Sequence, residues 1–394
     1  MVETSDGPLS GFKVVDFSRV LAGPHCGRML VDMGAEVIKV EPPDGDILRS
    51  GKPRRNSLTP GFTHQNVGKR NISIDMKRSE GVDLARQLLT KTDVVLENFR
   101  PGVMAKMGLG YDAVAQFNPG VVYASISGYG QTGSWVHRRA YAPLVHAEMG
   151  YLDGTARYLG TEVRQEPMSH GDLYTGVHCC TAIVAALLQR ERTGEGQHID
   201  VAMAETMLFM NEHAATNLSG ETEYLPTPNV ASPIYKTSSG DRVMVSFNPA
   251  ERGVFAQYLK AMEQRSLAED PRFRDYTARM KHREELLAII QTWILTFSDI
   301  DELEAALARG GLVMGKVRSL KEVAELPWLA ERGAVAEVSD RGTGSFRIPN
   351  TPWRFSKART GVRGAIAYRG EDNAEVLHDW LSLSHEEISS LEES

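Results

Sequence analysis

The segment SHGDLYTG at residues 169–176 contains the side chain best suited to covalent chemistry, the carboxylate of Asp172. Apolar residues recur at helical spacing from 177 to 188, which predicts a mostly buried helix beginning beside Asp172. Gly194 follows this stretch, as expected of a residue that ends a helix in the left-handed conformation. Gly171 has no side chain, so another molecule could approach the backbone closely here.

Two interpretations of Asp172 stay open on these residues alone. Aspartate is a preferred N-cap residue, and such a cap stabilises a helix by about 1 kcal/mol. Alternatively, the helix dipole keeps the carboxylate ionised, and Asp172 is a nucleophile at the mouth of a cleft.

The chain lacks the residue patterns that several other common catalytic mechanisms require. The chain has neither the G-x-S-x-G sequence of a serine hydrolase nor a P-loop. His170, Asp172 and His178 are too far apart on one helix to hold a metal ion together. Residues 128–133 read G-x-G-x-x-G after a strand, but residues 134–143 do not resemble the helix that follows in a dinucleotide site. We expect a glycine-rich turn or lid there.

Composition narrows the class of protein further. The chain has 394 residues, enough for two domains with a large core. A net charge of -7 without Lys/Arg runs argues against nucleic-acid binding. Three cysteines without metal-ligand spacing indicate a reducing compartment, and we expect a cytoplasmic protein. We find no signal peptide and no apolar run of 18 residues, so we expect no membrane span.

The chain order predicts a parallel sheet that positions Asp172. Strands are expected at 12–17 and 36–40 with a helix between them, which is a βαβ unit. Further strands are expected at 93–97, 121–126 and 197–201. Loops at the carboxyl ends of such strands bind ligands, and here they carry several cations beside the one carboxylate. An anionic ligand is therefore expected.

A second region follows a Gly-, Thr- and Pro-rich linker at 219–233. A hairpin is expected over 234–247, with helices at 252–263, 283–297 and 301–309.

Seven ordered motifs resemble one family. They are GPLSGFKVVDFSRVLAGP at 7–24, GAEVIKVEPPDGD at 34–46, KRNISIDMK at 69–77, DVVLENFRPG at 93–102, SISGYGQTG at 125–133, GDLYTG at 171–176 and RTGEGQHIDVAM at 192–203. The chain resembles the class III CoA transferases (CaiB/BaiF), which include formyl-CoA transferase and the α-methylacyl-CoA racemases.

The resemblance implies an α/β fold. A large Rossmann-like domain with a parallel sheet is expected from residues 1–224 and 326–394, and a smaller inserted α+β domain from 225–325. Two such chains are interlocked in a homodimer.

The resemblance also implies roles for residues. Asp172 matches the catalytic nucleophile, and Tyr141 and Gly171 lie at the substrate. Matches to the coenzyme A site are Arg19, Val20, Leu21, Ala22, Ile74, Asn98, Phe99, Lys106, Met107 and Arg139. CoA enters as the acyl-CoA substrate, and the partner is a small carboxylic acid. No tightly bound cofactor or metal is needed, and neither a nucleic acid nor a membrane is involved.

The implied reaction moves CoA from an acyl-CoA to a free acid through a covalent aspartyl intermediate. Backbone N–H groups near Gly171 are expected to stabilise the oxyanion. Arg19 and Leu21 stand where formyl-CoA transferase has histidine and glutamine, and Pro42 stands where it has arginine. No loop of consecutive glycines occurs at 234–260, so formyl-CoA and oxalate are disfavoured.

The alternative is the racemase branch, which uses a histidine together with the aspartate. Tyr141 stands at the position of that histidine. His146 is five residues further on and is expected to face elsewhere on a helix. We therefore prefer the transferase.

Overall fold

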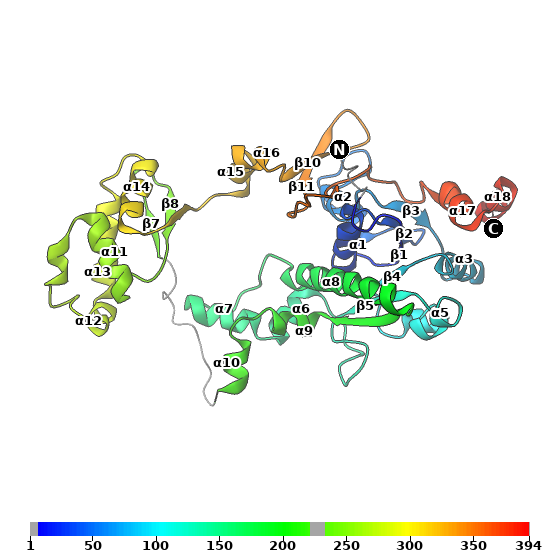
Figure 1. The fold of residues 1–394 in the computed structure, drawn as a ribbon, viewed down its shortest axis with the longest axis horizontal. Coiled ribbons are helices and arrows are strands. Elements are labelled where there is room, and N and C mark those ends of the chain that lie inside the picture. Colours follow the sequence, from blue (N-terminus) through cyan, green and yellow to red (C-terminus); the bar gives the residue numbers. More distant parts are fainter. Residues whose placement is uncertain (1–6, 221–232, 394) are drawn as a thin grey trace. The chain divides into compact units, whose positions relative to one another are not determined.

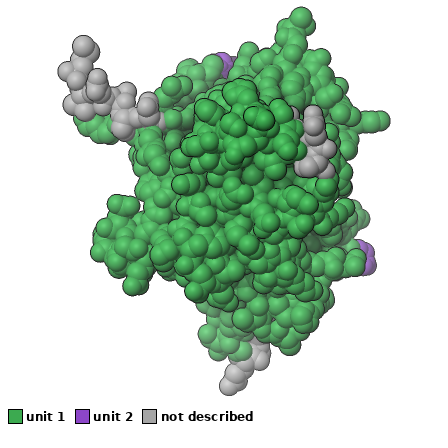
Figure 2. Space-filling view, turned by 90° about the vertical axis from the view of Figure 1, so that its right-hand side faces the viewer, with its two compact units in different colours: residues 1–153, 163–222, 328–394 green, residues 154–162, 223–327 purple. Residues whose placement is uncertain are grey.

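The computed structural model describes residues 7–220 and 233–393, with side chains through 391. The chain divides into two compact units (Figure 2). The first comprises residues 1–153, 163–222 and 328–394, and the second comprises 154–162 and 223–327. Most of the predicted linker lies outside the described residues.

A six-stranded parallel sheet organises the first unit, in the order β3-β2-β1-β4-β5-β6. Its strands are β1 (Lys13–Asp16), β2 (Glu36–Glu41), β3 (Arg70–Ser73), β4 (Val94–Glu97), β5 (Val122–Ser127) and β6 (Gln197–Ala202). The central strands are apolar on both faces, as expected for a parallel sheet covered by helices on both sides. The predicted βαβ arrangement is confirmed.

Successive residues of β1 point to opposite faces of the sheet and so enter different cores. Val14 packs with the apolar side chains of α1 (Ala22–Asp32) and α8 (His170–Thr193). Val15 packs on the other face with α3 (Ser79–Leu89) and α17 (Asn373–Leu381). The helices α1 and α8 lie against each other on the first of these faces (Figure 1).

Shorter elements complete the first unit. They are η1 (Ile47–Ser50), α2 (Pro60–Asn66), α4 (Val103–Lys106), α5 (Tyr111–Phe117), α6 (Ala142–Glu148), α9 (Met203–Phe209), α10 (Ala214–Ser219), α18 (His385–Glu393) and the antiparallel pair β10 (Val335–Ser339) and β11 (Ser345–Pro349). The helix α7 (Tyr151–Leu159) is divided between the two units after Asp153, and α16 (Pro327–Glu331) is divided after Pro327.

The second unit has its own hydrophobic core around a small antiparallel sheet. The strands are β7 (Ile234–Lys236), β8 (Arg242–Val245) and β9 (Met314–Lys316). The helices are α11 (Arg252–Met262), η2 (Arg265–Ala268), α12 (Tyr276–Lys281), α13 (Arg283–Ile294), α14 (Ile300–Gly310) and α15 (Leu320–Ala324). The pairing of β7 with β8 confirms the predicted hairpin.

Within the described residues, α8 alone is long and apolar enough to cross a membrane by length and composition. Buried core helices pass the same test, and Ile183 and Leu187 of α8 lie in the core beside α1. The helix is therefore weak evidence for a membrane span.

Candidate active site

Asp172 is the third residue of α8, in its first turn. The N-cap position belongs to Ser169, and no side chain there accepts a capping hydrogen bond. The interpretation of Asp172 as an ordinary N-cap is therefore wrong. At the other end Gly194 adopts φ 77° and its N–H donates to the carbonyl of Arg190, which confirms the predicted stop.

The first turn of α1 meets α8 beside Asp172. Gly176 lies one turn after Asp172 on the same face of α8. A Cβ atom at Gly176 would lie 2.6 Å from the carbonyl oxygen of Ala22, so only glycine allows the helices to approach this closely. The backbone N–H of Ala22, the first residue of α1, donates a hydrogen bond to the Asp172 carboxylate. The carboxylate thus lies at the N-terminal ends of two helices.

The half-buried position of Asp172 changes its protonation. Burial raises the pKa of this carboxyl to about 6, while the hydrogen bond from Ala22 opposes that rise. Asp172 is therefore mainly ionised at neutral pH although much of its hydration is lost. An ionised and partly desolvated carboxylate at two helix N-termini is suited to nucleophilic attack.

The backbone N–H of Gly171 already has a hydrogen-bond partner within the chain. Its N–H donates to Nε2 of His146 at 2.9 Å, and the His146 side chain is buried. This N–H is therefore engaged, and an oxyanion role for the other backbone N–H groups near Gly171 and the helix start stays a prediction.

His146 does not share a face with Tyr141, as expected, and it packs toward the start of α8. Tyr141 is the N-cap of α6, so the helix begins only at Ala142. The side chains of Val145 and His146 lie on the buried face of α6, and Tyr141 remains 67% exposed before the helix. The contact of His146 with Gly171, next to Asp172, is what the spacing in the sequence did not show.

Other aromatic and titratable side chains surround His146. Its ring centroid is 5.3 Å from Tyr151 and 6.3 Å from His170, which in turn stacks on Tyr174. Glu166 lies 3.8 Å from Nε2 of His170. Burial, with His170 adding to it, lowers the pKa of His146, so this imidazole is neutral and its Nε2 can accept the Gly171 N–H. Nδ1 of His146 is buried without a partner in the described part of the chain.

The loop between β1 and α1 contains three of the predicted CoA-site residues, Arg19, Val20 and Leu21, and a fourth, Ala22, begins α1. The Asn98 side chain makes two hydrogen bonds to the backbone of Arg19, accepting from its N–H and donating to its carbonyl, each at 2.8 Å. The Arg19 guanidinium is half-exposed and lies 3.8 Å from Asp44. Val20 adopts φ 68°, and Leu21 is the N-cap of α1. The structure thus brings Asn98 and this loop together, next to Asp172.

The remaining predicted CoA residues differ in exposure. Lys106 is exposed at the end of α4, and Phe99 and Met107 are half-buried against the core. Ile74 is only 5% exposed and belongs to the core, so it offers little surface to a ligand. The roles of these four side chains stay predictions.

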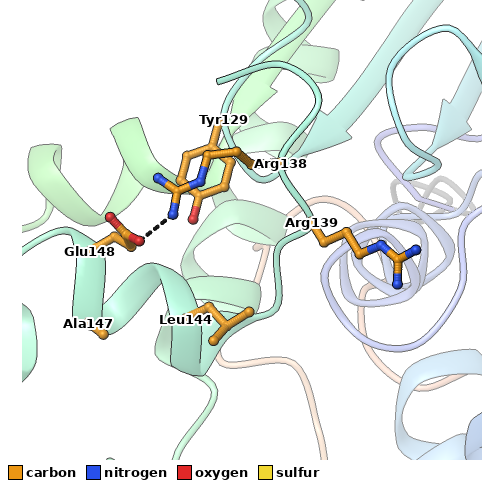
Figure 3. A pocket seen from close by; sticks show the side chains of 6 residues that line it. All are labelled: Tyr129, Arg138, Arg139, Leu144, Ala147 and Glu148. Carbon is orange, nitrogen blue, oxygen red and sulfur yellow. Dashed lines mark hydrogen bonds and ion pairs between the residues drawn. The ribbon is translucent and has the colours of Figure 1, made fainter. Parts of the chain in front are cut away.

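Arg139 lines a cavity of about 400 Å³ together with Tyr129, Arg138, Leu144, Ala147 and Glu148 (Figure 3). Arg138 pairs with Glu148, and its guanidinium lies over the rings of Tyr129 and Trp135. Arg139 is exposed and points away from this pair. The cation available for a ligand here is therefore Arg139.

The G-x-G-x-x-G stretch is a turn, as predicted. No helix begins between β5 and α6, and backbone N–H groups of the stretch are held by polar side chains. The N–H of Gly130 donates to the Ser127 hydroxyl, and that of Gln131 donates to Asp200.

Sequence reasoning missed two buried polar groups near the site. Burial raises the pKa of Glu97, at the end of β4, to about 7, and this carboxylate accepts the N–H of Phe99. Asp46 contacts the β1–α1 loop from the start of η1. The signal available in the sequence for Asp46 was its place at the end of the matched motif 34–46.

Comparison with known proteins agrees with these observations. The model of CoA-transferase family III matches residues 9–373. The chain belongs to CoA-transferase family III. It is 32% identical to a succinyl-CoA–D-citramalate CoA-transferase from Chloroflexus aurantiacus, covering 98% of this chain and 97% of that one. It is 33% identical to a succinate–glutarate CoA-transferase from Agrobacterium fabrum, covering 94% and 95%.

A solved structure shares the fold. The crystal structure of a CaiB/BaiF family protein from Brucella suis superposes with a TM-score of 0.83 at 31% identity, covering 95% of this chain and all of that one. The chain is therefore an enzyme of the CoA-transferase class, as its motifs predicted.

Proposed function

We propose that this enzyme moves CoA from a short dicarboxylic acyl-CoA, with succinyl-CoA as the first candidate, to a free carboxylic acid through covalent chemistry on Asp172. The placement of the Asp172 carboxylate at the starts of α1 and α8 carries this proposal. The relatives named for succinyl-CoA or succinate support the choice of donor.

The reaction begins when an Asp172 oxygen attacks the thioester carbonyl. The carbon–sulfur bond breaks, CoA leaves as a thiolate, and a mixed anhydride of Asp172 and the donor acid remains. The thiolate then attacks the Asp172 carbonyl and releases the donor carboxylate, which leaves an aspartyl-CoA thioester. The acceptor carboxylate reverses these two steps. Splitting the exchange in this way preserves the energy of the thioester.

The start of α1 is suited to the negative charge that develops on oxygen. The N–H groups in the first turn of a helix have no partner within the helix, and Gly23 supplies one beside the Ala22 N–H that already donates to Asp172. Pro24 has no N–H to offer.

CoA binding and assembly are further parts of the proposal. The β1–α1 loop, Lys106 and Arg139 hold the CoA portion, with the cations facing phosphate groups. Two chains form an interlocked homodimer.

The racemase alternative requires a histidine base near Asp172, and His146 lies nearby but is not suited to that role. His146 is fully buried, and its Nε2 already accepts the Gly171 N–H. A proton carrier must reach the carbon beside the thioester carbonyl and exchange its proton. The buried His146 does not meet this requirement, and Tyr141 provides no imidazole.

Chemical trapping tests the proposal. Protein is incubated with succinyl-CoA, quenched with hydroxylamine and digested, and the peptide containing residues 170–190 is analysed by mass spectrometry. We expect a hydroxamate on Asp172, because an anhydride or thioester at this carboxyl reacts with hydroxylamine. Asp172→Asn should lose both the adduct and CoA transfer while still binding CoA.

A second experiment on the same protein distinguishes a transferase from a racemase. A 2-methylacyl-CoA in deuterated water should take up no deuterium beside its carbonyl. Deuterium uptake without an aspartyl adduct would overturn the transferase proposal.

A further inference from the structure

The β1–α1 loop contains a backbone conformation that its sequence disfavours. Val20 has φ 68°, in the left-handed region. A β-branched residue is strained there, because its Cβ and branched side chain crowd the backbone. Contacts around the loop must therefore hold Val20 in place.

Asp46 supplies one such contact from the start of η1. Its Oδ2 accepts the backbone N–H of Val20 at 3.1 Å, and its Oδ1 accepts the N–H of Leu48 at 3.0 Å. The Asp46 side chain is buried, and its own backbone N–H is held by Glu41. Asp46 is therefore fixed by its surroundings and constrains Val20 in turn.

Lys39 links Asp46 to Ser18, which lies near the β1 end of the β1–α1 loop. Its Nζ atom lies 3.2 Å from Oδ2 of Asp46 and donates to the carbonyl oxygen of Ser18 at 2.8 Å. Lys39 belongs to β2 and is fully buried. A buried charge pair is costly unless each partner is fully engaged, and this pair also makes hydrogen bonds to the backbone of Ser18 and Val20 in the loop and of Leu48 in η1.

We propose that Asp46, together with Lys39, is a positioning residue for CoA transfer. The pair holds Val20 in the left-handed conformation, so that the chain turns and α1 begins at Ala22 with its N–H directed at Asp172. This inference rests on the proposed role of Asp172. Neither Asp46 nor Lys39 touches the Asp172 carboxylate, and both act through the backbone between Ser18 and Ala22.

The test compares Asp46→Asn with the double variant Asp46→Asn/Val20→Gly. Asparagine keeps the size of the side chain but has only one oxygen for the two backbone N–H groups and Lys39. We expect kcat with succinyl-CoA to fall at least ten-fold in Asp46→Asn. Glycine adopts φ 68° without strain, so the double variant should recover at least three-fold of that loss.

A second measurement does not depend on activity. Hydrogen–deuterium exchange of a peptide covering residues 18–26 should be faster in Asp46→Asn and slower again in the double variant. Asp112→Asn is the control, because Asp112 is an exposed aspartate of α5 and belongs neither to the β1–α1 loop nor to η1. The control should keep kcat within two-fold and leave exchange of this peptide unchanged.

The outcomes separate this inference from the proposed function. A general structural role would lower the melting temperature of Asp46→Asn without rescue of kcat or exchange by glycine, and that result would overturn the inference. If wild-type protein transfers no CoA, the exchange measurements still decide whether Asp46 holds the loop. Should Asp46→Asn prove insoluble, Asp46→Glu keeps a charge for Lys39 and serves in the same comparison.

Discussion

The Asp172 carboxyl combines two opposing influences at the scale of a single residue. Burial favours its protonated form, and the Ala22 N–H together with two helix N-termini favours its charged form. The first influence is the larger, so the pKa rises to about 6. A nucleophile balanced in this way is ionised at neutral pH without being held too tightly to react.

The pH dependence of catalysis should reflect this value. Because the attacking form is the carboxylate, kcat/KM should increase as pH rises through about 6 and level off above it. Initial rates of transfer from succinyl-CoA between pH 4.5 and 8.5 would measure it. The His146→Gln variant should show the same midpoint, because Asp172 sets this limb and glutamine does not titrate. A midpoint near 4 would show that Asp172 is not desolvated.

The raised pKa of Asp172 also affects the stability of the folded protein. The folded protein binds the Asp172 proton more tightly than the unfolded chain, so ionised Asp172 disfavours folding. Asp172→Asn should therefore have the higher melting temperature at pH 8. The difference should shrink as pH falls through about 6 and vanish below the ordinary value of 3.8. Equal melting temperatures at pH 8, measured by calorimetry, would contradict this prediction.

His146 gives a prediction about positioning. His146→Leu removes the acceptor for the Gly171 N–H, and a buried donor without a partner costs about 1–3 kcal/mol. We expect a lower melting temperature and at least a ten-fold loss of kcat, because the first turn of α8 carries Asp172. His146→Gln can still accept this hydrogen bond and should keep most of the activity. Equal losses in both variants would indicate that the hydrogen bond itself is not important.

At the scale of elements, regular periodicity was sufficient to predict the parallel sheet and α8. The strands β1, β2, β4, β5 and β6 and the hairpin β7–β8 all form where apolar patterning placed them. Spacing also predicted that His146 would not share a face with Tyr141, and the structure agrees. It could not show that His146 packs on Gly171, because that contact joins two different helices.

The parts of the site that depend on long-range contacts could not be read from the sequence. The hydrogen bond between Ala22 and Asp172 joins residues 150 positions apart in the chain. The engagement of Gly171 by His146 depends on how α6 packs against α8. The conformation of Val20 depends on Asp46, whose role no local pattern shows. The sequence motifs identified the residues of the site, but their contacts depend on how the helices and loops pack together.

Gly176 provides a prediction at this scale. In Gly176→Ala the new methyl group would meet the backbone carbonyl of Ala22 at 2.6 Å, so α1 must move away from α8. We expect destabilisation of about 1–3 kcal/mol, as for other overpacked cores, and loss of the Ala22 contact to Asp172. The kinetic midpoint should then shift above pH 6, because the N–H that lowers the pKa is lost. Gly154→Ala is the control, since a Cβ there meets nothing within 4 Å. A variant with wild-type rate and midpoint would argue against this role of Gly176.

At the scale of the whole molecule, the first unit leaves large apolar side chains in solvent on three consecutive helices. They are Val177 and Leu188 of α8, Leu208 and Phe209 of α9, and Leu218 of α10. Phe209 is 79% exposed in the single chain. Clusters of exposed apolar residues mark surfaces that bind a partner, and a second copy of this chain is the partner implied by the family resemblance.

We therefore expect a homodimer whose two chains are interlocked. Sedimentation should show a dimer at micromolar concentration, and Phe209→Asp should lower the melting temperature of that dimer because a buried unpaired charge is costly. Interlocked chains cannot separate without unfolding, so two differently tagged pools mixed at native pH should form no mixed dimers over days. Unfolding and refolding the two pools together should produce mixed dimers, which shows that the tags permit pairing. Mixed dimers that appear within minutes in native buffer would exclude interlocking, and a monomer in sedimentation would exclude the dimer itself.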